Sequence, residues 1–219
     1  MGLGVTIYCG YVTEYVAGLI LHTREGVAYR FDPGALCLEL LPTGGPGRWA
    51  RYEVLHTPAD LAAWAGRSRL RVDPALVEAG PADVERARAL RDALWRLTSA
   101  HVREETAALR PPSEPAAPGQ GPDVEIVNAM AAVPSLAPRI EPGGDFGWGG
   151  PITGERVLAS VARDAVELFT GPAAGRVREC ASDNCHLIFV DTSRPGRRRW
   201  CAMEHCGNRH KVRAHRGRA

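Results

Sequence analysis

Apolar residues recur at three- and four-residue steps in two long stretches of the chain, which is the period of a helix with one buried face. The first stretch predicts a helix over about residues 82–109, and the second predicts a helix that Thr153 caps and that runs to Phe169. The repeating positions are Val84, Ala87, Leu90, Leu94, Leu97 and His101 in the first helix, and Val157, Leu158, Val161, Ala165, Leu168 and Phe169 in the second. Both stripes predict core faces. His101 is expected to be a surface residue or a core histidine with an internal partner, and not a ligand.

Shorter patterns, divided by glycine and proline, fill the first third of the chain. Residues 27–31 and 51–55 have β-like content beside Gly- and Pro-containing turns and predict two strands. Residues 35–41 fit either a strand or a first helical turn. Thr57-Pro58-Ala59-Asp60 has an N-cap threonine, a proline at the first helical position and an acid three residues after the cap. It predicts a helix that ends near Gly66.

The remaining segments are less regular. Asp73-Pro74 repeats the helix-opening device before Gly80, and residues 123–132 predict a short helix. Residues 142–150 predict a glycine-rich loop, and no phosphate cradle is expected there because no Lys-Ser/Thr follows. The proline-rich residues 111–122 are either a linker or an excursion within the N-terminal domain. Residues 1–30 are an N-terminal extension or contain a first strand.

Length and hydropathy indicate a soluble chain. With 219 residues and 45% hydrophobic content, it can form one medium domain and a small one. No window approaches eighteen uninterrupted apolar residues, so no membrane partner is expected. Glu14 interrupts the apolar start and no Lys or Arg precedes Arg24, which removes the charged region of a signal peptide. We expect a cytoplasmic location.

Four of the six cysteines form two pairs with identical C-x4-C spacing, Cys180 with Cys185 and Cys201 with Cys206, separated by fifteen residues. Two short chelating loops of this kind can supply four thiolates to one tetrahedral Zn²⁺ without help from the rest of the chain. The spacing predicts one structural zinc ion rather than disulfides. His186, His205 and His210 are alternative ligands, but four thiolates already close the site.

Charge is distributed unevenly along the chain. Residues 176–219 hold eleven Lys or Arg against four acids, a net charge of +7, whereas the remaining residues hold sixteen against twenty-one, a net charge of −5. This polarity predicts a polyanionic partner, with a solvated basic tail as the alternative reading.

The sequence around the cysteines resembles the CGNR zinc finger of bacterial transcription regulators. The resemblance rests on the Cys206-Gly207-Asn208-Arg209 tetrad, on Phe189-x-Asp191-x-Ser193-Arg194 and on Arg198-Arg199-Trp200-Cys201-x-Met203. It implies DNA binding. The residues expected to contact nucleic acid are Arg194, Arg197, Arg198, Arg199, Asn208, Arg209, Lys211, Arg213 and Arg216.

Local roles within the finger follow from residue type. Residues 187–189 predict a strand that seals the metal centre, and Trp200 is expected to complete that small core, with stacking on a base as the alternative. Asp191 is expected to hold Arg194 or Arg198. A helix from Gly207 places Arg209, Arg213 and Arg216 on one face, flanked by Lys211 and Arg218.

Residues 31–172 are similar to the ABATE domain that accompanies CGNR fingers. The similarity rests on Leu36-Cys37-Leu38-Glu39-Leu40, on residues 57–64 and on residues 89–94. Where the family shows Asp-Phe-x-Asn-Thr, this chain has Glu39-Leu40-Leu41-Pro42-Thr43 and no Asn. The implied fold class is a mainly α domain with a small β-hairpin or sheet (α+β), followed by a small C-terminal zinc finger at residues 176–219.

These observations predict a DNA-binding transcription regulator that is not an enzyme, because four thiolates leave zinc no open position. The N-terminal domain is expected to sense a signal, with a small molecule as one candidate effector, or to mediate assembly, with a homodimer as one form. Two alternatives remain open. One is an RNA-binding regulator, and the other is a redox- or zinc-sensing switch that acts through protein contacts.

Overall fold

The computed structural model describes residues 5–8, 11–14, 18–23, 25–107 and 120–216. The proline-rich break predicted at 111–122 therefore lies mostly outside the described residues, as does Arg218. The helices are α1 (Leu36–Leu40), α2 (Pro58–Arg67), α3 (Pro81–Ala107), α4 (Gln120–Ala132), α5 (Gly154–Thr170) and α6 (Asn208–Arg216). No helix in the described part of the chain is both long and apolar enough to span a bilayer.

Every sheet in the described ranges has two strands. The antiparallel pairs are β1 (Val5–Tyr8) with β2 (Tyr11–Glu14), β3 (Leu19–His22) with β4 (Ala28–Phe31), β6 (Ala137–Ile140) with β7 (Phe146–Gly149), and β9 (Val177–Glu179) with β10 (Ile188–Val190). The parallel pair is β5 (Val77–Glu78) with β8 (Ile152–Thr153). The expected mainly α fold with small β elements is confirmed.

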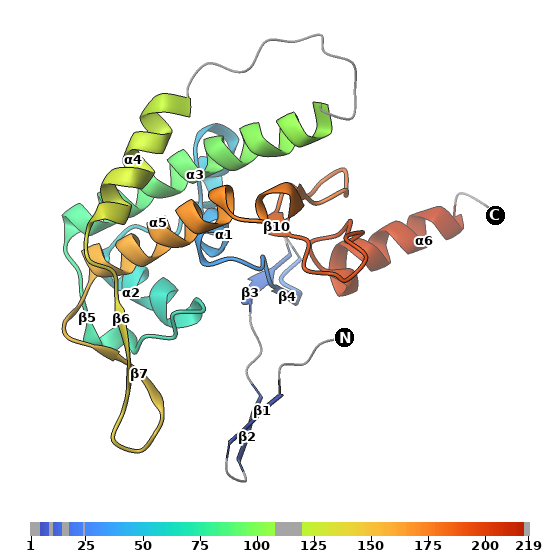
Figure 1. Cartoon of the computed structure of the whole chain (residues 1–219). Coiled ribbons are helices and arrows are strands. Elements are labelled where there is room, and N and C mark those ends of the chain that lie inside the picture. The colour runs from blue at the N-terminus through green and yellow to red at the C-terminus, as the bar shows by residue number, and fades with distance from the viewer. Residues whose placement is uncertain (1–4, 9–10, 15–17, 24, 108–119, 217–219) are drawn as a thin grey trace.

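The main core lies between α1, α3 and α5, whose apolar faces meet. In Figure 1 α4 packs beside α3 and α5, whereas α6 projects from the opposite side of the molecule. Capping explains where two of these helices begin. Thr57 Oγ1 accepts from the Asp60 N–H and Asp60 Oδ2 accepts from the Thr57 N–H, which is the predicted capping box of α2. Thr153 Oγ1 likewise accepts from the Arg156 N–H.

Most predicted elements are present. The helices over 82–109, 123–132 and 153–169 correspond to α3, α4 and α5, and the strand at 27–31 corresponds to β4. Residues 35–41 contain the helix α1, and β3 lies within the first thirty residues. His101 has the expected internal partner, since its Nε2 lies 2.8 Å from the Ala174 carbonyl oxygen.

Three expectations were wrong. The strand predicted at 51–55 is absent, because residues Gly47–Tyr52 wind into a 3₁₀ helix that stacks Trp49 on Trp95. The helix after Asp73 is only the 3₁₀ turn Pro74–Leu76, followed by β5. Residues 142–150 are not simply a loop, since they include β7, whose Trp148 Nε1 donates to the Leu70 carbonyl. In each case a tertiary contact of an aromatic ring or a strand pairing overrides the local pattern.

Candidate metal centre and basic surface

Four cysteine side chains converge between β9, β10 and the N-terminus of α6. Cys180 follows β9 directly, and its N–H donates to the Leu187 carbonyl across the β9–β10 pair. The Cys185 N–H donates to the Ser182 carbonyl and closes a tight turn between the first two thiols. Cys201 precedes the π-helical turn Met203–Gly207 that leads into α6, and Cys206 lies within that turn. The sequence thus brings both C-x4-C loops to one point.

The geometry of the four thiols fits one zinc ion. Their Sγ atoms all lie within 4.8 Å of one another, and Cys201 Sγ is 3.6 Å from both Cys185 Sγ and Cys206 Sγ. Zn–S bonds of about 2.3 Å place the sulfurs of a tetrahedral site about 3.8 Å apart. Cys180, Cys201 and Cys206 are buried and Cys185 is half-buried, so a bound ion would be shielded from water. The cluster can hold the expected single zinc ion in a structural role.

The thiols crowd each other strongly enough to separate their acidities. Hydrogen bonds among them lower the pKa of Cys180 and raise that of Cys201 far above the ordinary thiol value. Tyr29, against the same cluster, has its pKa raised by burial and then by the negative charge of the thiolates. A divalent cation bound among the four thiols would replace their protons and let all four cysteines ionise around one positive charge.

The metal centre is sealed by residues from outside the finger. Phe31 of β4 is fully buried in the same apolar cluster as the four cysteines and Phe189, and Leu21 and Tyr29 pack against it. The small core around the four thiols therefore includes residues from outside the finger, which the spacing of the cysteines does not predict. Trp200 packs against this cluster as expected, and the predicted strand at 187–189 is β10 at Ile188–Val190. Sequence alone gave no signal that β4 belongs to the zinc core.

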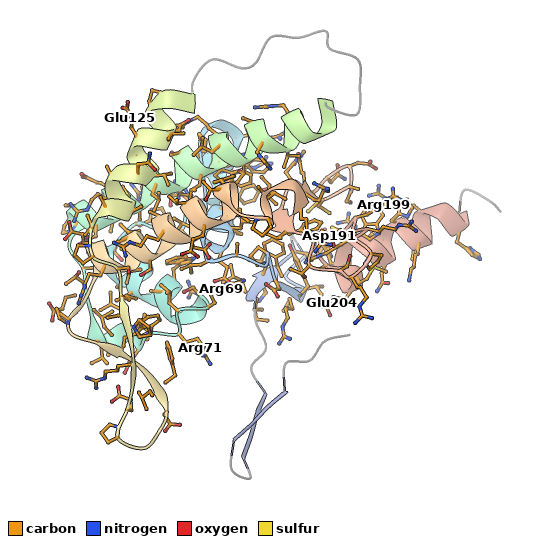
Figure 2. All side chains as sticks on the ribbon, in the orientation of Figure 1. Arg69, Arg71, Glu125, Asp191, Arg199 and Glu204 are labelled. Carbon is orange, nitrogen blue, oxygen red and sulfur yellow. The ribbon has the colours of Figure 1, made fainter. Side chains whose placement is uncertain are left out.

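Asp191 stabilises the loop between the cysteine pairs. Asp191 is buried and accepts hydrogen bonds from the Ser193 N–H, the Ser193 hydroxyl and the Arg198 N–H. Burial opposes ionisation of Asp191, but the hydrogen bonds from Ser193 and Arg198 lower its pKa overall. Asp191 thus holds the Arg198 backbone, close to the role expected of it. Figure 2 labels Asp191 and Arg199 in the part of the molecule that bears α6.

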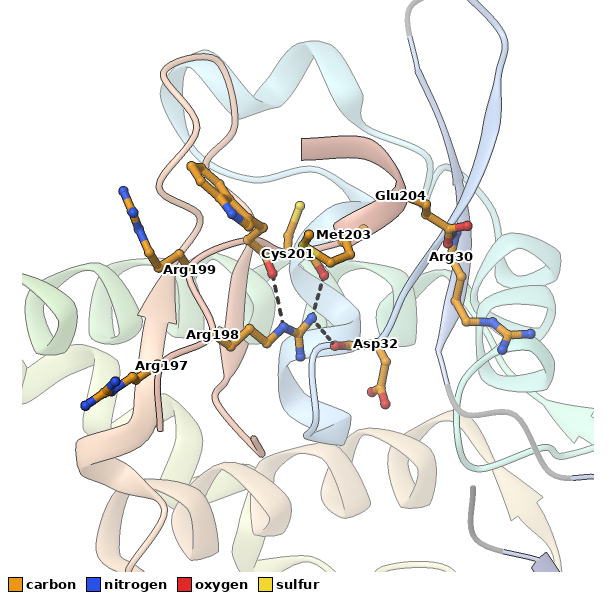
Figure 3. Close-up of a pocket in the computed structure, with 10 residues that line it drawn as sticks. Arg30, Asp32, Arg197, Arg198, Arg199, Cys201, Met203 and Glu204 are labelled. Carbon is orange, nitrogen blue, oxygen red and sulfur yellow. Dashed lines mark hydrogen bonds between the residues drawn. The ribbon is translucent and has the colours of Figure 1, made fainter. Parts of the chain in front are cut away.

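The Arg198 side chain turns inward. Its guanidinium donates to the carbonyl oxygens of Trp200, Cys201 and Asp32 and lies over the Phe189 ring, 4.2 Å from the centroid. Burial lowers its pKa. Figure 3 shows Arg198 directed at Asp32 and Cys201, whereas Arg197 and Arg199 point away from it. Arg198 therefore ties β4 to the second cysteine loop.

The other predicted nucleic-acid residues lie on the surface. Arg194, Arg197 and Arg199 are exposed on the loop between the cysteine pairs, and Asn208, Arg209, Lys211 and Arg213 are exposed on α6. Arg213 Nη1 pairs with Asp183 at 2.8 Å, and Asn208 Nδ2 donates to the Glu204 carbonyl. Arg216 is the last residue of α6. Arg197 and Arg199 border a hollow of about 630 Å³, which Arg30 and Glu204 also line (Figure 3).

The fold and this site define a protein with a helical N-terminal part and a C-terminal four-cysteine zinc finger. Comparison with protein families matches residues 34–172 to ABATE, described as "Putative stress-induced transcription regulator", and residues 176–219 to the CGNR zinc finger. The chain belongs to the ABATE family and ends in a CGNR zinc finger. Both matched families are of regulator and zinc-finger type, and together with the thiol cluster they support a zinc-binding regulator. A search of curated proteins finds no match.

Proposed function

We propose that this zinc-binding regulator acts by binding duplex DNA through its finger and has no enzymatic activity. The observation that carries the proposal is the exposure of α6. Every described side chain on this helix, at positions 208–213 and 215, is exposed, and the helix is strongly basic. Val212, at 50% exposure, is the one large apolar residue of this helix, and a helix that is otherwise so polar gains little by packing on its own protein. Its free surface is therefore available to a partner.

The spacing of the arginines along α6 suits the major groove of DNA. Arg209 and Arg213 lie four residues apart, which places them on one helix face, and Arg216 ends α6 three residues later. The Arg213–Asp183 ion pair is exposed and contributes little stability, so a base edge of DNA can replace Asp183 as the partner of Arg213. An α-helix fits the major groove of B-DNA, where arginine is the usual partner of guanine. We assign base contacts to Arg209 and Arg213.

The positive charge of the finger also favours DNA as the partner. The finger segment carries +7, and a zinc ion held by four thiolates would reduce this to about +5. We assign phosphate contacts to Arg197 and Arg199, with Arg194, Lys211 and Arg216 beside them. Arg198 contributes by shaping the loop, because its guanidinium is engaged with three carbonyl groups. The part at residues 34–172 would then sense a signal or mediate assembly.

Alanine substitutions in the two sets of arginines should have different effects on DNA binding by the full-length, zinc-loaded protein. The double variant Arg197→Ala/Arg199→Ala should weaken binding to every duplex and reduce the salt slope by about 0.9 per lost phosphate contact. Arg209→Ala should cost about 1–3 kcal/mol on the preferred site and relax its sequence specificity. Fluorescence anisotropy at several salt concentrations, on duplexes from a binding-site selection, measures both.

Arg67→Ala, an exposed arginine at the end of α2 and outside the finger, is the matched control and should leave DNA affinity unchanged. The proposal fails if no duplex shows salt-dependent affinity. Stronger competition by single-stranded RNA than by duplex DNA would favour the RNA-binding alternative instead.

A further inference from the structure

A large cavity lies between the finger and the helical part of the chain. Its volume is about 1030 Å³, slightly above the usual range of small-molecule sites. One wall is formed by the 3₁₀ turn Gly47–Tyr52 and Trp95 of α3, and the other by the finger loops around Cys185 and Cys206. Residues of the β3–β4 hairpin, including Tyr29, complete it. A ligand in this cavity would touch both parts of the molecule at once.

The helical wall is a rigid aromatic surface. Trp49 stacks on Trp95 with ring centroids 5.0 Å apart and an interplanar angle of 8°. Trp95 is fixed by its Nε1, which donates to the carbonyl oxygens of Leu41 and Gly44. Gly45, at φ +151°, permits this approach, because a Cβ there would lie 2.6 Å from the Trp95 ring. The wall is thus built before any ligand arrives.

Aromatic rings of the finger side face the same space. His186, next to Cys185, meets Trp49 edge-on at a centroid distance of 5.3 Å. His205, next to Cys206, stacks on Tyr29 at 4.5 Å. Rings prefer offset-stacked or edge-to-face contacts at such distances, so a planar ring system is the shape that this lining accommodates best.

The mouth of the cavity is positively charged. Arg48 lies over the Trp49 ring at 4.5 Å and Arg51 over the Tyr52 ring at 4.8 Å, and both arginines are exposed. Within the described ranges neither guanidinium forms an ion pair with a carboxylate. The acids of the lining are Asp183, which pairs with Arg213, and Glu25, which has an interaction of its own.

From these contacts we propose that the cavity binds a planar aromatic anion, a ring system that carries a carboxylate or a phosphate. The ring would pack among Trp49, Tyr52 and His186, and its anionic group would meet the forked donors of Arg48 and Arg51. The size of the cavity admits a two-ring carboxylate or a mononucleotide. Because Cys185 and Cys206 line the finger wall, occupancy would also brace the two metal-binding loops.

Equilibrium dialysis of full-length, zinc-loaded protein can test the proposal without any DNA, so its failure is separate from failure of DNA binding. The probes are 2-naphthoate and AMP, which separate the carboxylate source from the nucleotide source. Their matched analogues are 2-naphthalenemethanol, which keeps the ring and lacks the charge, and cyclohexanecarboxylate, which keeps the charge and lacks the flat ring. At least one planar anion should bind saturably, one molecule per chain, at least about tenfold more tightly than either analogue.

The double variant Arg48→Ala/Arg51→Ala removes only exposed side chains and should weaken binding by about tenfold or more. The Arg67→Ala control should bind like the parent protein, and matching thermal unfolding curves verify that all variants are folded. The bound anion should also slow transfer of zinc to a chelator. The proposal is overturned if neither probe binds saturably, if the neutral naphthalene binds equally well, or if Arg48→Ala/Arg51→Ala binds unchanged.

Discussion

Arg69 neutralises a carboxylate that the fold buries completely. Glu39 of α1 is 0% exposed, and its oxygens accept from the Arg69 Nε at 2.9 Å and from the Arg69 N–H at 2.8 Å. Burial raises the pKa of Glu39, and Arg69 offsets only part of that effect. Arg69, labelled in Figure 2, also donates from its Nη2 to Asp32 Oδ1 at 3.1 Å. The carboxylate of Glu39 on α1 is therefore stabilised by Arg69, a residue outside that helix.

Replacing Arg69 should expose this dependence. Arg69→Ala leaves a buried charge without its partner, which typically costs about 3–5 kcal/mol of unfolding free energy. The double variant Arg69→Ala/Glu39→Gln should recover part of that loss, since it removes the unpaired charge. Urea denaturation followed by circular dichroism gives both values. A loss of under about 1 kcal/mol, the size of a surface pair, would show that Glu39 is neutral in the fold.

Asp191 should contribute to the acid limit of stability. Its folded pKa is lowered, so its contribution is fully present above the unfolded value of about 3.9 and is lost as pH falls through the folded pKa. Asp191→Asn should therefore destabilise the protein at neutral pH and flatten the decline of stability below about pH 4. Unfolding curves across that pH range measure it. Asp145→Asn, in the exposed β6–β7 connection, should leave the decline unchanged.

Residue spacing predicted the cluster of four thiols that can hold zinc, but it did not predict the different roles of the arginines. Two C-x4-C pairs specify four nearby thiols because the chelating loops are short. Arg197, Arg198 and Arg199, in contrast, are adjacent and identical in type, so nothing in the sequence separates the inward one from the outward two. The separation comes from Asp191, which fixes the Arg198 backbone, and from carbonyl groups that the fold supplies.

At the scale of elements, the β3–β4 hairpin has two unlike faces. Leu21, Tyr29 and Phe31 face the zinc core, whereas Ile20 and Arg30 are exposed, as alternation along a strand requires. Just after the hairpin, the Pro33 carbonyl accepts a hydrogen bond from the Val190 N–H of the finger at 2.8 Å. This hairpin is thus a structural part of the metal centre.

Truncating each face of the hairpin tests that role. Phe31→Ala removes a fully buried ring and should cost about 3–5 kcal/mol of stability while speeding zinc release to a chelator. Ile20→Ala, on the 56% exposed position of the same hairpin, should change neither quantity appreciably. Chromogenic chelator kinetics and thermal unfolding provide the measurements. Equal zinc-release rates for both variants would mean that the finger seals its own metal.

Long periodic elements were predictable and short ones were not. The stripes of α3 and α5 repeat over many turns, so a few exceptions do not hide them. Residues Gly47–Tyr52 form a 3₁₀ helix because Trp49 is drawn onto Trp95, a partner 46 positions away in the sequence. A six-residue pattern carries too little information to predict such a contact. For the same reason, the cavity that Trp49 lines could not be predicted from the sequence.

At the scale of the whole molecule, the two parts that sequence comparison separates share their cores. Val177, Ile188 and Val190 of the finger belong to the main core with α3 and α5, while Phe31 belongs to the zinc core. The His101 ring of α3 also meets the Ala174 carbonyl just before β9. Neither part can therefore shift without repacking the other.

Zinc removal should therefore destabilise the entire chain and not the finger alone. Metal binding is coupled to the folding of its ligand loops, and here those loops also hold β9, β10 and the β3–β4 hairpin. Chelation, or Cys206→Ser, should lower the midpoint of a single thermal transition and raise hydrogen exchange in β4 and the β9-facing end of α3 as well as in residues 176–216. Cys37→Ser alters a buried cysteine outside the cluster and should retain one equivalent of zinc. A separate low-temperature transition confined to 176–216, with exchange in α3 and β4 unchanged, would show that the finger unfolds independently.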